Sequence, residues 1–238
     1  MEQKKRAPYF QSTTAAALLL FGSFSLPTDL LSPVPPNLKW PLNSEVGYRI
    51  NLANAEQDEP EDGTQDNFRA AIVNAANTWN QVADVNFKLV DQGDSTTTAG
   101  YNGINEVIFQ NRPDSQRAGI TQAYLINGEV VEVDTVINTK FDFDVTGTPL
   151  NTELDLQSVA LHEFGHWLVL DHSERPLAIM YPLIKPGTVR RDLDQEDKSR
   201  MQRLYKPTVS VSQRKIDRNG VTSVYKRQRS LPSFRKYF

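Results

Sequence analysis

The sequence predicts an α+β domain, on three observations. Alternating apolar and polar residues typical of strands recur between residues 47 and 137, and helical periodicity is confined to three separate segments. There is no internal repeat. Segregated strands and helices are the layout of an α+β fold. The 238 residues, 39% hydrophobic and 23% charged, are enough for one packed domain with appendages or for two small ones.

The first half of the domain predicts strands on either side of one helix. Residues 47–52 alternate and predict the first strand, and residues 85–89 and 106–109 predict the next two. The acidic segment 56–66 and the Gly/Ser/Thr-rich segment 91–102 are expected to be loops. Between the first two strands, apolar residues recur at steps of three and four, which predicts an amphipathic helix of about four turns with Trp79 in the core. These residues are Phe68, Ile72, Ala75, Trp79 and Val82.

The second half predicts a hairpin and two further helices. Asn127-Gly128 is a strong turn signal, so residues 119–125 and 130–137 are expected to pair, with a loop at 142–151. Thr152 and Asp155 have the spacing of a capping box and place the start of the second helix near Thr152. Residues 194–205 predict the third helix, which Pro207 stops. The expected buried residues of these two helices are Leu154, Leu161, Phe164, Leu168, Met201, Leu204 and Tyr205.

The amino-terminal segment has the pattern of an export signal. Basic residues at positions 4–6 precede the apolar stretch 15–26, which is too short to span a bilayer but fits the core of a signal peptide, with small residues at 23 and 25 for cleavage. We therefore interpret residues 1–25 as a candidate signal peptide, 26–39 as a Pro-rich linker and 40–206 as the folded domain. This predicts a secreted or extracytoplasmic protein; an uncleaved apolar extension is the alternative.

The net charge of −3 conceals two opposite regions. Residues 207–238 hold eight basic residues and one acidic residue, a charge of +7 that leaves −10 on residues 1–206. We expect a flexible tail, and the alternative is an arm that contacts anionic surfaces. The tail has no nucleic-acid-binding motif, so no nucleic-acid partner is expected. A monomer is favoured.

All three histidines lie within eleven residues, and they carry the chemistry that the sequence predicts. His162 and His166 are four residues apart, so on a helix both imidazoles project from one face and can bind one zinc ion. Glu163 can take a proton from a water molecule that the metal activates and pass it to a leaving amine. His172 can supply a third ligand if the helix ends near residues 168–170 and the chain turns back. With no cysteine in the chain, disulfides, thiolate sites and a cysteine nucleophile are excluded.

Residues 162–172 resemble the metzincin signature H-E-x-x-H-x-x-G-x-x-H, and within that clan the chain is most similar to the matrixins, the matrix metalloproteinase family (peptidase M10). Ser173 follows the third histidine as in matrixins, and residues 178–182, AIMYP, resemble the Met-turn. The resemblance runs from residue 40 to residue 205. It implies a twisted, mixed five-stranded sheet with two long helices, an active-site cleft, and a small carboxy-terminal subdomain that holds the Met-turn and a terminal helix.

The resemblance also implies site residues and partners. It implies one catalytic zinc ion bound by His162, His166 and His172, with Met180 beneath these ligands and a protein or peptide as substrate. Tyr181 and Pro182 would begin the wall of the main specificity pocket. An extended substrate would pair with an edge strand, where backbone hydrogen bonds hold the peptide and alternate side chains fill pockets. The residues of that strand would be Gly119, Ile120, Thr121, Gln122, Ala123 and Tyr124.

Val169 departs from the signature, because the family has glycine at this position. Glycine allows the helix to break with a positive φ, and a β-branched residue there is costly. Either the turn uses a negative φ, or the backbone is strained by about 1–3 kcal/mol.

Other departures concern metals and latency. Vertebrate matrixins bind a structural zinc through further histidines, and none remain here. Calcium is left open: Asp134, Asp142 and Asp144 could supply oxygen ligands, although the interpretation as polar loop residues is favoured. Without cysteine there is no cysteine switch, and the segment before the domain is too short for a folded inhibitory prodomain.

The leading hypothesis is a zinc-dependent endopeptidase. The alternatives are a catalytically inactive zinc-bound binding module on the same fold, which Val169 motivates, and a gluzincin-type site in which Glu196 replaces His172 as a ligand. A polyanion-binding role for the tail is a further alternative.

Overall fold

The computed structural model describes seven segments of the chain: residues 17–21, 39–55, 65–90, 98–126, 129–205, 213–216 and 222–225. The chain divides into two compact units, Met1–Tyr205 and Lys206–Phe238. The predicted turn at Asn127-Gly128 lies outside the described residues, as do nearly all of the linker and most of the candidate signal peptide, of the basic tail and of the two predicted loops at 56–66 and 91–102.

A six-stranded mixed sheet forms the base of the first unit, in the order β1-β5-β6-β4-β2-β3. The predicted strands are all present, and each lies within one or a few residues of its expected bounds. Strands β3, β2, β4 and β6 run parallel to one another, and β5 is antiparallel to β6. The bounds are Ala17–Phe21 (β1), Ser44–Asn51 (β2), Val85–Leu89 (β3), Asn105–Gln110 (β4), Gly119–Ile126 (β5) and Glu129–Asn138 (β6).

Strand β1 is the sixth strand, which the sequence did not predict. It comes from the apolar stretch interpreted above as the core of a signal peptide. It pairs antiparallel with β5, from Ala17 opposite Leu125 to Phe21 opposite Thr121. The other five strands make the expected five-stranded mixed sheet, in which β5 is the edge that β1 covers.

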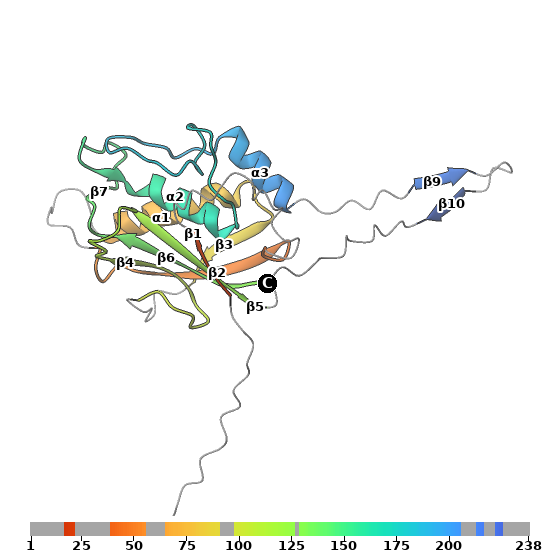
Figure 1. Cartoon of the computed structure of the whole chain (residues 1–238), viewed down its shortest axis with the longest axis horizontal. Helices are drawn as coiled ribbons and strands as arrows, with labels where there is room; N and C mark the ends of the chain where they lie inside the picture. Colours follow the sequence, from red (N-terminus) through yellow and green to blue (C-terminus); the bar gives the residue numbers. More distant parts are fainter. Residues whose placement is uncertain are drawn as a thin grey trace, which may run out of the picture. The chain divides into compact units, whose positions relative to one another are not determined.

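Two helices pack against each other over one face of the sheet (Figure 1): α1, Gln65–Asn80, and α2, Leu156–Trp167. Of the residues predicted to face the core from this helix, the four within α1 are buried, whereas Val82 lies beyond its end and is partly buried. The Trp79 indole donates a hydrogen bond to the Leu161 carbonyl at 2.8 Å. Phe164 of α2 lies against the ring of Tyr48 of β2, with 5.4 Å between centroids. These contacts fix α2, and the histidines on it, relative to the sheet.

The start of α2 corrects the sequence prediction. Residues 154–155 are extended and form β8, Leu154–Asp155, which pairs with β7, Phe143–Asp144, within the predicted loop. Asp155, and not Thr152, is the N-cap: its carboxylate accepts the Ser158 N–H at 2.8 Å. Asp155 is fully buried and also forms an ion pair with Arg191, so tertiary contacts select it over Thr152.

The third predicted helix is present as α3, Gln195–Tyr205, with Met201 and Tyr205 buried as expected. The second unit contains a short antiparallel pair, β9, Gln213–Ile216, and β10, Thr222–Tyr225. Within the described segments, every helix falls short of the length and apolar character that a membrane span requires.

Candidate metal centre and active site

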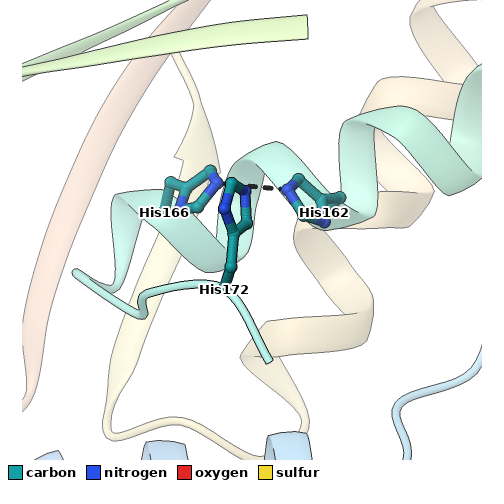
Figure 2. Close-up of side chains that lie close together, drawn as sticks. All are labelled: His162, His166 and His172. Carbon is teal, nitrogen blue, oxygen red and sulfur yellow. Dashed lines mark hydrogen bonds between the residues drawn. The ribbon is translucent and has the colours of Figure 1, made fainter. Parts of the chain in front are cut away.

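The three histidines converge on one point, as the sequence predicted (Figure 2). His162 and His166 project from the same face of α2, and His172 reaches them from the segment that follows the helix. The three potential ligand atoms lie within 4.8 Å of one another, and this is the only such group of three among the described residues. The Nε2 atoms of His162 and His166 are 3.1 Å apart.

The hydrogen bonds of the imidazoles show that this point suits a cation. Nδ1 of His162 lies 2.7 Å from the Ile179 carbonyl, and Nδ1 of His166 lies 2.7 Å from the Leu170 carbonyl. A carbonyl only accepts, so both Nδ1 atoms must carry the proton.

Each Nε2 then presents a lone pair when the ring is neutral. Burial lowers the pKa of His162 to about 4 and that of His166 well below its ordinary value, so both rings are neutral at pH 7. Two lone pairs facing each other at 3.1 Å repel, and a shared metal ion removes this repulsion. The donor set of three neutral imidazoles fits zinc.

Helix α2 ends in a Schellman turn, and Val169 occupies the position where glycine is usual. The Val169 N–H donates to the His166 carbonyl at 2.9 Å, and the Leu170 N–H donates to the Gly165 carbonyl at 3.1 Å. Val169 has a φ of +59° and is buried. The structure therefore selects the strained one of the two predicted possibilities, and His172 still reaches the other imidazoles.

Met180 lies directly against the helix that carries the ligands, as the Met-turn resemblance implied. It is fully buried, and a Cβ built on Gly165 would lie 2.2 Å from its Sδ, so glycine is needed there for the sulfur to approach. The Met180 carbonyl accepts the Ser173 N–H at 2.7 Å, next to His172. The segment 173–180 thus connects the third histidine to the floor of the site.

Asp197 anchors this segment from α3, and the sequence analysis missed it. Its buried carboxylate accepts the N–H groups of Ile179 at 2.8 Å and Met180 at 3.2 Å. Ile179 in turn holds His162 through its carbonyl. An acidic residue in the first turn of a helix usually signals only favourable charge, so nothing in the local pattern marked Asp197 as a tertiary contact.

Glu163 lies between α2 and β5 and is 6% exposed. Its Oε2 accepts a hydrogen bond from the Thr121 hydroxyl at 2.5 Å, and its Oε1 would be 2.3 Å from a Cβ built on Gly119. Glycine at 119 is therefore required for the carboxylate to approach β5. Burial raises the pKa of Glu163 to about 7, although the Thr121 hydroxyl and the positive charge of Arg117 lower it.

A small cavity adjoins His162 on the side of residues 178–184. It has a volume of about 50 Å³ and is lined by Tyr181, Pro182, Ile184 and Arg190, among others. Tyr181 and Pro182 therefore line a cavity next to His162, and their role as a specificity-pocket wall stays a prediction. A larger open hollow of about 710 Å³ lies near Asn54 and Arg112. Neither the histidines nor Glu163 line it, so it is separate from the metal-binding residues.

The structure does not gather the candidate calcium ligands. Asp134 is buried in β6 and accepts the Gly100 N–H at 3.0 Å, Asp144 accepts the N–H groups of residues 146–148, and Asp142 is exposed. Glu196, the alternative zinc ligand, is not part of the group of His162, His166 and His172 that could hold a metal ion. Asp171, next to His172, is exposed.

Comparison with known proteins places this geometry in context. The model of the family Peptidase_M10, described as matrixin, matches residues 39–206. The chain is 32% identical over 154 residues to metalloendoproteinase 1 of Glycine max, covering 61% of this chain and 48% of that protein. It is 32% identical over 190 residues to stromelysin-1 of Mus musculus, covering 75% and 35%, and 29% identical over 177 residues to neutrophil collagenase of Homo sapiens, covering 72% and 34%. The chain thus spans less than half the length of these relatives.

Proposed function

Because the chain belongs to the matrixin family, we propose that it is a zinc-dependent endopeptidase with Glu163 as its general base. We assign the catalytic domain to residues 40–206. One observation carries the proposal. Three neutral imidazoles converge on one point, and the buried carboxylate of Glu163 directly follows the first of them, His162, on α2.

The cofactor is zinc, and His162, His166 and His172 are the residues that would hold it. A zinc ion bound by three imidazoles supplies Lewis acidity, which lowers the pKa of water and polarises a carbonyl group. Three protein ligands leave a coordination position open for these molecules, as catalytic zinc sites require.

Glu163 is suited to moving a proton. A general base works best when its pKa lies near the working pH, and burial holds the pKa of Glu163 at about 7. Thr121 occupies Oε2, so Oε1 is the oxygen that takes the proton from water and later gives it to the leaving amine. The proton therefore enters and leaves the site at one atom.

The substrate class is a protein or peptide in extended form. We propose that residues 119–124 of β5 pair with its backbone and that the cavity beside Tyr181 and Pro182 takes one side chain. Strand β1 already pairs with β5 at residues 121–125, so a peptide that uses these positions must take the place of β1. The cavity of about 50 Å³ favours a small side chain unless its wall moves.

We also propose export from the cytoplasm, on the basic and apolar pattern of residues 1–25. Amino-terminal sequencing of the mature protein tests this, because cleavage near residue 25 is expected. The inactive binding module remains the alternative, and the meeting of His172 with the other two histidines despite Val169 supports the endopeptidase.

The experiment that tests the proposal is digestion of casein or gelatin by the full chain. We expect cleavage that a zinc chelator abolishes and added zinc restores. Glu163→Ala should lower kcat by a factor of at least about 100 while leaving bound zinc unchanged. Glu174→Ala, which removes an exposed carboxylate just past His172, is the matched control and should keep full activity. Chelator-insensitive cleavage, or full activity of Glu163→Ala, would contradict the proposal.

A further inference from the structure

A chain of buried hydrogen bonds reaches Glu163 from the end of its own helix. The Trp167 indole N–H donates to the Thr135 hydroxyl at 2.8 Å, the hydroxyls of Thr135 and Thr121 are 2.7 Å apart, and Thr121 donates to Glu163 Oε2 at 2.5 Å. Trp167 and Thr121 are 0% exposed and Thr135 is 1% exposed. Water is therefore not available as a substitute partner for these groups.

The direction of every bond in this chain is determined while Glu163 is ionised, the form in which it acts as a base. An indole N–H only donates, and an ionised carboxylate only accepts. Thr135 must therefore accept from Trp167, and Thr121 must give its single proton to Glu163. The bond between the two hydroxyls then has one possible direction, from Thr135 to Thr121. Each hydroxyl donates once and accepts once.

Three elements of the fold supply this arrangement. Thr121 and Thr135 are directly opposite each other in the register of β5 and β6, so their side chains are neighbours on one face. Trp167 is four residues after Glu163, so both side chains lie on the face of α2 that meets the sheet. The chain of bonds begins and ends on α2 and passes through the two strands.

We propose that Thr121, Thr135 and Trp167 are positioning residues that hold the Glu163 carboxylate in one rotamer, with Oε2 bonded and Oε1 free to exchange a proton. The Thr121 hydrogen bond is made to Oε2, whereas Oε1 is the oxygen that lies against Gly119. A glutamate has three side-chain torsions, and the terminal one is broad, so an unheld carboxylate would present either oxygen in several orientations. This inference rests on the proposed function of Glu163.

The test uses the zinc-loaded full chain and a fluorogenic peptide. Thr121→Val has nearly the shape of threonine but cannot donate. We expect it to lower kcat by about 10- to 100-fold, the range for a lost hydrogen bond to a charged group, with KM changed less than about twofold. Thr121→Ser restores the hydroxyl and should recover kcat to within about threefold.

Thr135→Val removes the next hydroxyl in the chain of hydrogen bonds. It also tests the inference if Thr121→Val folds poorly. It removes only the partner behind Thr121, so its expected loss is smaller, about two- to fivefold. Because Thr135 acts through Thr121, the double variant should be no slower than Thr121→Val alone, whereas independent effects would multiply. Thr78→Val, at a partly buried threonine of α1 whose hydroxyl donates to the Asn74 carbonyl, is the matched control and should keep the original kcat.

Zinc content and urea denaturation are measured on each variant, so that loss of metal or of folding is separated from loss of orientation. The inference is overturned if Thr121→Val retains kcat within twofold, if Thr121→Ser loses as much as Thr121→Val, or if the two valine effects multiply. Full activity of Glu163→Ala would instead overturn the proposed function, and the inference with it.

Discussion

The three ligands of the metal centre are positioned in two different ways. His162 and His166 are placed by the local geometry of one helix, in which residues four apart share a face. His172 is placed by a Schellman turn with a valine at a φ of +59°, and by the bond between Ser173 and Met180. The first pair reaches one face as soon as α2 forms, and the Ile179 and Leu170 carbonyls then orient its rings, whereas the third ligand needs the tertiary structure of residues 168–180 to reach the site at all.

This difference teaches where the site is vulnerable. Phe164 and Trp167 pack α2 on the sheet, which fixes the backbone positions of His162 and His166. The third ligand depends on α3, because Asp197 holds the segment that leads to it. Substitutions that act on one region and not on the other separate the two contributions.

The largest effect is expected from removing a ligand of either kind. His172→Ala and His162→Ala should each lower zinc affinity by at least about 100-fold, since the loss of a direct ligand exceeds that of a supporting contact. Competition with a chromogenic chelator measures the affinity. If His172→Ala left zinc affinity unchanged while His162→Ala abolished binding, His172 would not be a ligand and the alternative with Glu196 would return.

Asp197→Ala should have the next largest effect, on stability and on the third ligand. It leaves the buried N–H groups of Ile179 and Met180 without acceptors, which costs about 3 kcal/mol of unfolding free energy. Urea denaturation measures this, with the exposed Asp192→Ala as the control expected to lie within about 0.5 kcal/mol of the original protein. Equal stability of the two variants would show that α3 does not anchor the site.

The stability of the metal-free chain should depend on pH below 7, because buried groups of α2 titrate there. The pKa of His162 is about 4 in the folded chain against 6.5 in the unfolded chain, so the unfolded chain binds the extra proton between these values. This group therefore lowers stability as the pH falls from about 6.5 to 4.

Glu163 acts in the opposite sense on the same pH axis. Its folded pKa of about 7 exceeds the unfolded value of 4.5, so its contribution is full below pH 4.5 and is lost as the pH rises through 7. Urea midpoints across this range should fall less steeply on acidification in His162→Gln than in the original chain. They should fall more steeply in Glu163→Gln. A His162 imidazole that titrates near 6.5 in NMR spectra would contradict the first expectation, and a Glu163 carboxyl group that titrates near 4.5 would contradict the second.

The smallest effect is expected at Val169. Val169→Gly relieves about 1–2 kcal/mol of backbone strain at the positive φ. It also removes a buried side chain and leaves a cavity, which costs a similar amount, so the unfolding free energy should change by less than about 1 kcal/mol. Val159→Gly, at a buried position within α2, has no strain to relieve and should cost about 3 kcal/mol. Thermal unfolding compares them, and equal losses would mean that Val169 is not strained.

The parts of the site that sequence predicts are those set by spacing along the chain. The i and i+4 spacing predicted that His162 and His166 share one face of a helix, with Glu163 beside them. Alternating apolar residues predicted strands β2 to β6. Spacing did not decide between Thr152 and Asp155 as the cap, because a buried ion pair with a residue 36 positions away selected Asp155. The contact of Thr121 with Thr135 requires the register of two strands, and the contact of Asp197 with Met180 requires the docking of α3. The periodicity of a single sequence determines neither the register of these strands nor the docking of α3.

Strand β1 has a consequence for how fast the site can be reached. Backbone pairing does not discriminate by side chain, so the N–H and C=O groups of β5 bond equally well to a segment of the same chain or to a separate peptide. A segment joined to the domain competes at a fixed effective concentration, on the order of millimolar for short flexible connections, whatever the dilution of the protein. While β1 stays joined to the domain, peptides at micromolar concentration would therefore bind mainly in the intervals when it is detached. The proposed cleavage near residue 25 would convert this tethered competitor into one that diffuses away.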